Sequence, residues 1–262
     1  MKKFIVGLLS FILSVACVFG ATSCKKGSDN KLVLGFDAEF PPYGYEENGQ
    51  YVGFDIEYAK KVCGNLGYEL ELKPIDWDGK DGLLKSGAID FIWNGFTYQG
   101  RENDYEWTKQ YLDNSIVVLV KSDSGIVTFS DLAGKSVAAQ SDSSGETALN
   151  AEENAELKAS FKGGAFALEA DYNTACTKLV AGTYDAIVVD VGVAKYLCQS
   201  KSGLTILDDA IATETYAVGF LKGNVELCKK ISDEMEKVGK DEAFIKGLCE
   251  KYGVDYNSFL LK

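Results

Sequence analysis

Residues 31–93 contain the most informative pattern of the chain, and they read KLVLGFDAEFPPYGYEENGQYVGFDIEYAKKVCGNLGYELELKPIDWDGKDGLLKSGAIDFIW. Short apolar runs at residues 31–36 and 89–93 are typical of buried strands. Residues 54–66 instead carry apolar side chains close to a helical period, which predicts an amphipathic helix.

The intervening segments complete an alternating pattern. Residues 68–74 alternate as a strand, and residues 79–86 form a short apolar helix. Helices that alternate with short apolar strands favour a mostly parallel sheet covered by helices. The sequence therefore predicts an α/β fold.

The same order recurs further along the chain. Strands are expected at 116–120, 135–140, 165–169 and 186–189, helices at 145–157 and 174–181, and a helix-rich region at 224–252. Two similar β/α units in tandem indicate two lobes, and about 230 residues are enough for each lobe to have its own core.

The N-terminus has the pattern of an export signal. Lys2 and Lys3 precede an apolar run at residues 4–19, and small residues lead to Cys24. The run is too short for a spanning helix, which needs about 20 apolar residues. We expect residues 1–23 to be a signal peptide.

Cys24 follows small residues and precedes a polar stretch, which resembles a bacterial lipoprotein signal. The resemblance implies lipidation of Cys24, a linker over residues 24–30 and attachment to the membrane without a span. Cys17 is a weaker candidate, and plain secretion after cleavage is the alternative.

Composition narrows the function. The chain has 262 residues, 27 Lys and Arg, 39 Asp and Glu and a net charge of -12, so a nucleic-acid partner is not expected. It has no histidine and no C-x-x-C pair, and we expect neither a metal nor a cofactor. The remaining cysteines are expected as buried free thiols, with a disulfide as the alternative; they are Cys63, Cys176, Cys198, Cys228 and Cys249.

Six short motifs occur in one order between residues 31 and 262. They are Gly35-Phe-Asp-Ala-Glu-Phe-Pro-Pro-Tyr43, Gly53-Phe-Asp-Ile-Glu57, Trp77-Asp78 with Leu84-Lys-Ser-Gly87 and Asp90, Gly95-Phe-Thr97 with Arg101, Asp131-Leu-Ala-Gly-Lys135, and Tyr184-Asp-Ala-Ile-Val-Val-Asp190. Each motif alone is weak. Together they resemble the polar amino-acid solute-binding proteins of ABC transporters (bacterial solute-binding protein family 3).

The resemblance implies a two-lobed type II periplasmic-binding-protein-like fold, with the second lobe inserted into the first and two crossover hinge strands. Lobe 1 would comprise residues 31–110 and 217–262, and lobe 2 residues 116–211. The hinge would lie at residues 111–115 and 212–216.

The resemblance also implies a site for an amino acid in the interlobe cleft. Arg101 matches the family's carboxylate-binding arginine, whose planar guanidinium can hold both oxygens. Asp190 matches the aspartate that holds the ammonium group. Ser143 and Ser144 match a hydroxyl pair at a helix start that meets the carboxylate, or they are a plain helix cap.

Several further residues match or neighbour ligand-binding positions of the family, but with less specific roles. Thr97 and the backbone of Gly95 would add hydrogen bonds, although the interval from Thr97 to Arg101 is one residue shorter than in many members, so the contact of Thr97 stays open. Asp37 and Phe40 match positions near the ligand's side chain or amine. Asn94 and Trp93 are close enough in sequence to shape the same pocket.

The function implied is that of an extracellular lipoprotein, expected as a monomer, that delivers a polar L-amino acid to an ABC permease at the outer face of the cytoplasmic membrane. Glutamine, cystine and basic amino acids are compatible. One alternative is an enzyme on the same fold, such as a dehydratase, with Asp37 and Glu39 as acid and base. The other is a lipoprotein that senses a ligand through a partner.

Overall fold

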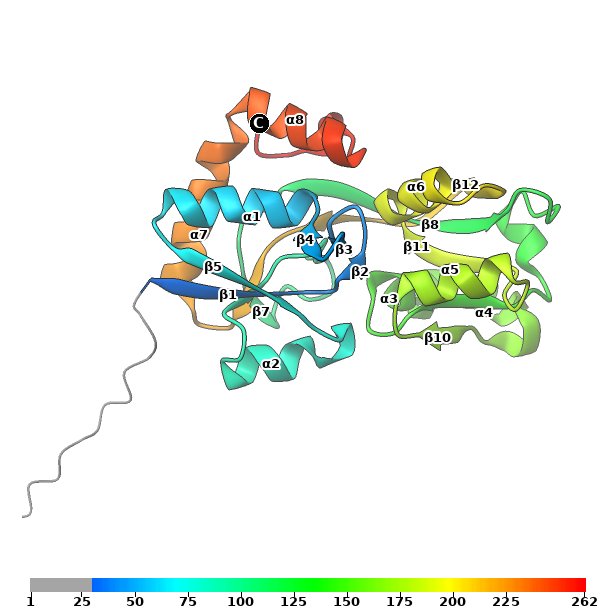
Figure 1. The fold of residues 1–262 in the computed structure, drawn as a ribbon. Coiled ribbons are helices and arrows are strands. Elements are labelled where there is room, and N and C mark those ends of the chain that lie inside the picture. Colours follow the sequence, from blue (N-terminus) through cyan, green and yellow to red (C-terminus); the bar gives the residue numbers. More distant parts are fainter. Residues whose placement is uncertain (1–29) are drawn as a thin grey trace, which may run out of the picture.

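The computed structural model describes residues 30–262, so the predicted signal peptide and the predicted lipidation site Cys24 lie outside the described residues. Two α/β lobes stand side by side (Figure 1). The first contains a five-stranded sheet in the order β5-β1-β6-β13-β7. Its strands are β1 (Lys31–Phe36), β5 (Glu69–Pro74), β6 (Phe91–Ile92), β7 (Tyr105–Trp107) and β13 (Gly219–Leu221).

Four helices cover this sheet and the rear of the first lobe. They are α1 (Phe54–Asn65), α2 (Lys80–Ser86), α7 (Val225–Gly239) and α8 (Glu242–Tyr252). A small antiparallel sheet of β2 (Glu39–Phe40), β3 (Gly44–Glu47) and β4 (Gln50–Val52) rises beside α1 at the edge that faces the second lobe (Figure 1). Sequence patterning did not predict this small sheet.

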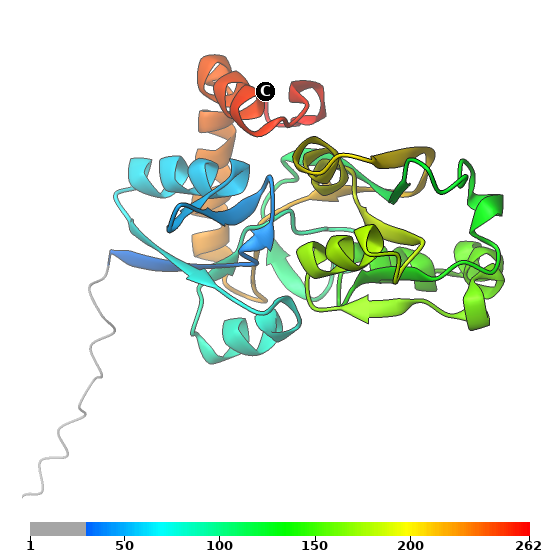
Figure 2. The same cartoon turned by 45° about the vertical axis from the view of Figure 1, so that its right-hand side comes forward.

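The second lobe has a sheet in the order β10-β9-β11-β8-β12. The strands are β8 (Leu112–Lys121), β9 (Val137–Gln140), β10 (Ala167–Glu169), β11 (Ala186–Asp190) and β12 (Leu204–Tyr216). The helices are α3 (Ser144–Asn150), α4 (Ala155–Ser160), α5 (Tyr172–Val180) and α6 (Val191–Ser200). Figure 2 shows these helices on both faces of the sheet.

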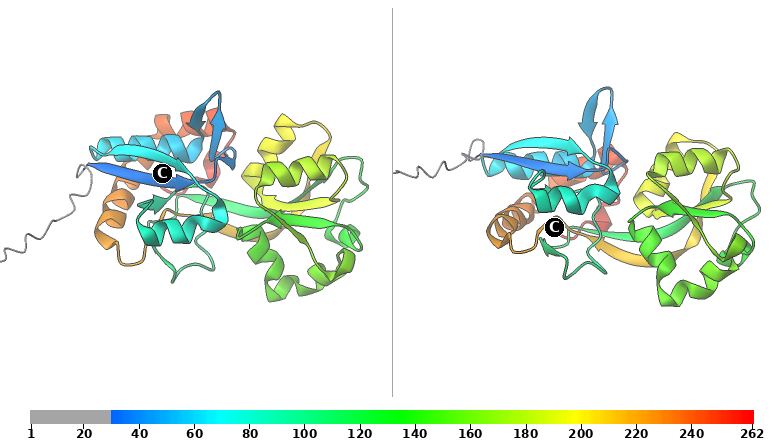
Figure 3. Two further views of the ribbon diagram at one scale, coloured as in Figure 1. Left: turned by 60° about the horizontal axis from the view of Figure 1, so that its bottom comes forward. Right: turned by 90° about the horizontal axis from the view of Figure 1, so that it is seen from below.

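Two long strands join the lobes. β8 leaves the first lobe and β12 returns to it, and they pair antiparallel from Leu112↔Tyr216 to Ile116↔Ala212. Seen from below, the chain between the lobes narrows to these strands (Figure 3). The second lobe is therefore an insertion in the first, as the resemblance implies.

One expectation needs correction. The helix predicted over residues 145–157 is broken, because α3 ends at Asn150 and a 3₁₀ turn at Glu152–Asn154 separates it from α4. The sheets are mostly parallel, as predicted: four of the five strands in each sheet run in one direction, and only β13 in the first and β8 in the second run against them.

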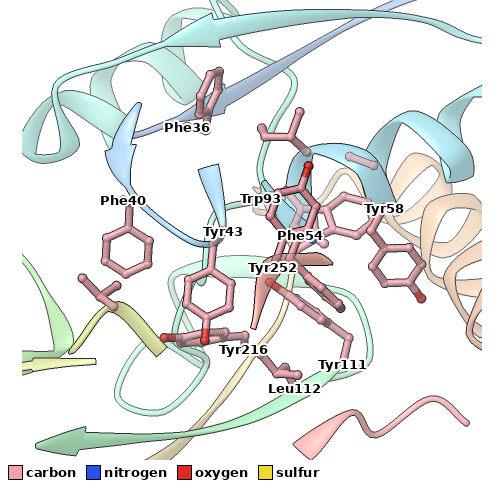
Figure 4. Close-up of a cluster of buried hydrophobic side chains, with 14 of the residues drawn as sticks. Phe36, Phe40, Tyr43, Phe54, Tyr58, Trp93, Tyr111, Leu112, Tyr216 and Tyr252 are labelled. Atoms are coloured by element: carbon pink, nitrogen blue, oxygen red, sulfur yellow. The ribbon is translucent and has the colours of Figure 1, made fainter. Parts of the chain in front are cut away.

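The core of the first lobe is rich in aromatic residues and reaches the cleft. Figure 4 shows Tyr43 beside Tyr216, and their ring centroids are 5.2 Å apart in an edge-to-face arrangement. The ring centroid of Phe40 lies 6.0 Å from that of Tyr172 in the second lobe. Buried aromatic side chains therefore form one wall of the interlobe region.

Trp93 belongs to this core and not to the cleft. It is fully buried, and its ring centroid lies 5.2 Å from that of Tyr58 and 6.0 Å from that of Tyr111. The hypothesis that Trp93 shapes the ligand pocket is therefore wrong.

The cysteines within residues 30–262 are free thiols, as expected; they are Cys63, Cys176, Cys198, Cys228 and Cys249. Over the same residues, no helix has both the length and the apolar character that a membrane span requires.

Candidate ligand-binding site

A small pocket lies between the lobes, with about 280 Å³ of space not filled by atoms, including space open to solvent. The first lobe contributes Asp37, Phe40, Trp77, Asn94, Gly95, Thr97 and Arg101, and the second contributes Gln140, Ser143, Ser144 and Asp190. The structure thus brings all nine predicted site residues together around one space. Their roles in binding stay predictions.

Trp77 and Gln140 line the pocket and were not predicted as site residues. Trp77 stands in a quoted motif, so its position in the sequence was a signal that could have found it. Gln140 ends β9 of the second lobe, and its neighbour Ser141 begins the loop to α3. Only the fold shows that the end of β9 meets Asp37 of the other lobe.

Arg101 lines the pocket from the first lobe. A turn holds it, in which the Arg101 backbone N–H donates to the Tyr98 carbonyl at 3.1 Å. Its guanidinium lies 5.4 Å from the centroid of the Phe96 ring and donates one hydrogen bond, at 3.1 Å, to the Asp142 carbonyl of the second lobe. A guanidinium has five N–H donors, so it retains donors for a planar carboxylate.

Ser143 caps α3 and uses its hydroxyl to do so. The hydroxyl donates to the Gln140 carbonyl at 2.8 Å and accepts from the Glu146 backbone N–H at 3.2 Å. The Ser144 hydroxyl donates to Glu214 at 3.4 Å, which is a weak contact. For Ser143, the plain cap reading accounts for the side chain.

Asp190 supplies a negative charge to the same pocket. It ends β11 and precedes α6, and its carboxylate makes no cap hydrogen bond to that helix. It accepts from Asn114 Nδ2 at 2.8 Å and from the Tyr216 hydroxyl at 2.5 Å. Burial raises the pKa of Asp190, so a cation in the pocket would stabilise its charged form.

Asp37 occupies the side of the pocket toward solvent. Its carboxylate accepts from Gln140 Nε2 at 2.7 Å and from the Glu39 backbone N–H at 2.8 Å. Burial raises the pKa of Asp37 to about 6. The Asn94 side chain accepts from the Asp37 backbone N–H at 2.8 Å, and its buried Nδ2 has no partner among the described residues.

Gly95 and Thr97 are positioned from beneath the pocket. The Gly95 N–H donates to Asp55 at 2.6 Å, and the Tyr111 hydroxyl donates to the same oxygen at 2.8 Å. Gly95 has φ of 55°, and a Cβ there would stand 2.7 Å from Phe40 Cε1. Only glycine fits this conformation and space. Thr97 forms a backbone bridge with Tyr216 and is almost fully buried.

A second, wider cavity opens outward from the pocket, and we call it the acidic mouth. Its lining includes Asp37, Glu39, Asp76, Asp78 and Asp171 and no Lys or Arg. Asp37 and Trp77 line both cavities and mark the boundary between them. Glu39 thus lines the acidic mouth and not the pocket. Its carboxylate accepts a hydrogen bond from Asn173 of the second lobe.

Within residues 30–262, no three or more His, Cys, Asp or Glu side chains are arranged so that they could hold a metal ion. The residues present offer opposite charges at separate points of a small enclosed space. Such an arrangement suits a zwitterion.

Fold and site together define a two-lobed solute-binding protein. Residues 32–254 match the model of the bacterial extracellular solute-binding proteins, family 3, and the chain belongs to this family. Its members are binding proteins that serve transport.

Proteins with similar sequences or structures are also amino-acid-binding proteins. The L-cystine-binding protein TcyJ of Escherichia coli K12 is 29% identical over 86% of this chain and 83% of its own length. The arginine-binding extracellular protein ArtP of Bacillus subtilis is 29% identical over 96% and 98%. A histidine-bound substrate-binding protein of an ABC uptake transporter from Streptococcus pneumoniae superposes with a TM-score of 0.80 at 31% identity, over 85% of this chain and 92% of that one.

Proposed function

We propose that this chain captures a basic L-amino acid in the interlobe pocket and delivers it to an ABC importer. One observation carries the proposal. The pocket has Arg101 and Asp190 for the two charges of an amino acid, and it opens past Asp37 into the acidic mouth.

The main-chain groups of the ligand determine its orientation. The carboxylate would bind Arg101, and the ammonium group would bind Asp190, because each charge leaves water only where an opposite charge replaces its hydration. Asn94 Nδ2 is a further buried donor that the described residues leave without a partner. These contacts come from both lobes.

The side chain of the ligand would point past Asp37 and Trp77 into the acidic mouth. Five carboxylates without a basic residue attract a cation and repel an anion. The far end of cystine is itself a zwitterion, so it would bring a carboxylate among these acids together with an ammonium group, and glutamine would leave the acids without a charged partner. The names of ArtP and of the histidine-bound neighbour support a basic ligand.

Closure of the lobes would enclose the ligand. In the structure Gln140 of the second lobe bonds Asp37 of the first, and the Trp77 indole donates to the Asp142 carbonyl at 3.1 Å. We infer that rigid units 31–110 with 217–262, and 116–211, rotate about residues 111–115 and 212–216. A ligand that contacts both units stabilises the closed state through its differential affinity.

Location and partner complete the proposal. Cys24 is lipidated and anchors a monomer at the outer face of the cytoplasmic membrane, where an ABC permease recognises the closed lobes. A binding role without catalysis is part of the proposal. In support, Glu39, the partner of Asp37 in the enzyme alternative, bonds Asn173 and does not line the pocket.

Thermal unfolding with the twenty amino acids, ornithine and cystine tests the proposal. A ligand at a hundredfold excess over Kd adds about 2.7 kcal/mol to the free energy of unfolding, enough to raise the melting temperature by several degrees. We expect a shift with arginine, lysine or ornithine. A shift with cystine or glutamine alone would contradict the basic ligand, and no shift with any amino acid would contradict the binding class.

Asp37→Asn tests the side-chain assignment. We expect this variant to bind the basic ligand about tenfold or more weakly, because it removes the one carboxylate shared by the pocket and the mouth. Asp76→Asn is the matched control, because Asp76 lines the acidic mouth but not the pocket, and it should weaken binding of the basic ligand less. Equal affinities of native protein and Asp37→Asn would show that the side chain lies elsewhere.

A further inference from the structure

Asp190 is half of a pair of buried carboxyl groups. Its neighbour is Glu214 of β12, which lies across β8 from β11 and does not line the pocket. Asn114 of β8 donates from one nitrogen to both carboxyl groups, at 2.8 Å to Asp190 and 2.7 Å to Glu214. The exposed fractions are 2% for Asp190 and 6% for Glu214.

No cation offsets this pair. Within residues 30–262, neither Asp190 nor Glu214 belongs to an ion pair. Arg101 lines the same pocket but bonds the Asp142 carbonyl. The other donors to the pair are neutral hydroxyl groups, that of Tyr216 to Asp190 and that of Ser144 to Glu214.

The remaining titratable groups around the pair come from both lobes. Tyr43 faces it from the first lobe and Tyr172 from α5, and burial raises their pKa values and that of Tyr216 well above the usual range, so all three stay neutral. Asp37 lines the same pocket from the first lobe.

Two neighbouring carboxyl groups in a dry site cannot both ionise at neutral pH, because each charge lacks hydration and repels the other. Burial and the negative charge of Asp190 raise the pKa of Glu214 to about 8. Burial also raises the pKa of Asp190. Because the two carboxyl groups share one Asn114 nitrogen and neither is paired with a cation among the described residues, the empty pocket favours a single negative charge on the pair at pH 7, with one proton retained.

We propose that Glu214 is a positioning residue that holds this proton beside Asp190 in the empty pocket and loses it to solvent when the ammonium group of a ligand arrives at Asp190. The charges balance: a pair of charge -1 and one ammonium cation become a pair of charge -2 with the bound cation, and one proton enters the solvent. The inference rests on the proposed function of the pocket.

Proton release makes affinity depend on pH. Below the pKa of Glu214, each bound ligand must expel up to one proton, so affinity rises by up to about tenfold per pH unit. Above that pKa, the empty pair has already lost the proton and the dependence disappears. Binding would thus be weaker in acidic surroundings than in neutral ones.

Calorimetric titration with L-arginine at pH 7, in buffers of different ionisation enthalpy, counts the released protons. We expect the native protein to release between about 0.5 and one proton. Glu214→Gln should release close to none and should bind with an affinity that changes little between about pH 7 and about pH 8, above the range in which Asp37 titrates. Asp37→Asn is the control for protons that come from Asp37, and it should still release the proton of Glu214.

A count of zero for the native protein, or equal counts for native protein and Glu214→Gln, would overturn the inference. A second measurement needs no ligand: the protonated carboxyl bands in infrared spectra of the free protein at pH 7 should lose the contribution of one carboxyl group in Glu214→Gln, and Asp55→Asn identifies the contribution of Asp55, whose pKa is also raised. Bands of equal intensity in the native protein and Glu214→Gln would also overturn the inference. Loss of that contribution without any binding of amino acids would contradict the proposed function and leave the proton pair standing.

Discussion

Arg101 is the residue on which the carboxylate assignment depends. Its guanidinium already spans the cleft to the Asp142 carbonyl and rests on the Phe96 ring, which fixes its plane before a ligand arrives. Fixed donors cost less entropy on binding than mobile ones.

Arg101→Ala should therefore weaken amino-acid binding by about 2–5 kcal/mol and leave the free protein folded. Arg101→Lys should recover only part of this loss, because an ammonium group cannot grip two oxygens in one plane. Isothermal titration measures both. Native-like affinity in Arg101→Lys would show that charge alone suffices there.

Asp55 supports the site without lining it. Burial raises its pKa to about 7, against hydrogen bonds from Tyr111 and Gly95 that lower it. The folded state therefore binds this proton more tightly than the unfolded state does. The contribution of Asp55 to stability is intact below about pH 4 and declines as the pH rises from about 4 to about 7.

Asp55→Asn should remove that decline, because an amide keeps an acceptor for Gly95 and has no proton to lose. Chemical denaturation between about pH 4 and about pH 8 should show a flatter dependence of the free energy of unfolding on pH than in the native protein. An unaltered slope in the variant would assign the dependence to other buried carboxyl groups, such as Asp37.

At the scale of elements, the loop after β6 places three site residues on one short segment. Gly95 holds the segment in a left-handed conformation, and a side chain there would collide with Phe40. The segment also receives Asp55 from α1 and borders Tyr216 of β12. The loop is thus clamped by a helix, a strand and the small sheet.

Gly95→Ala should lower both stability and ligand affinity, by about 1–3 kcal/mol in unfolding free energy. Gly49→Ala is the matched control, because Gly49 also has a positive φ of 76° but no atom within 4 Å of the position that a Cβ would take. Thermal unfolding compares the two. Equal losses would mean that backbone strain, and not the contact with Phe40, explains the requirement for glycine.

The sequence predicts the helices and strands well, but it does not predict which residues from distant elements come together at the site. The strands that end at Phe36 and Asp190 are readable from apolar runs, and the ordered motifs place Arg101 and Asp190 at one cleft. The break at Ala151 and the small sheet at residues 39–52 escape prediction, because neither has a strong period. Gln140 and Glu214 escape it because only tertiary structure brings β9 and β12 to the site.

At the scale of the whole molecule, Asp142 links the lobes. It has a left-handed φ of 57°, its carbonyl accepts from Trp77 and Arg101, and its carboxylate pairs with the buried Lys80 of α2. Residues held in such sparsely populated conformations persist where their surroundings fix them. All three partners belong to the first lobe.

Lys80→Met should therefore shift the ligand-free protein toward an open state, by about fivefold for the loss of about 1 kcal/mol of attraction between the lobes. Small-angle scattering should report a larger radius of gyration for the variant, and saturating ligand should restore the native value. Lys85→Met, an exposed change on the same helix, is the control. Identical scattering of both variants would contradict a role of Lys80 in closure.

The most direct test of the central claim compares L-arginine with three analogues by isothermal titration. Agmatine lacks the carboxylate, argininic acid replaces the ammonium group with a hydroxyl, and citrulline has a neutral side chain. We expect arginine to bind and each analogue to bind at least about thirtyfold more weakly, since each removes one charge that the pocket meets. Affinities for the analogues equal to that for arginine, or no binding of arginine and the other basic amino acids, would contradict the claim.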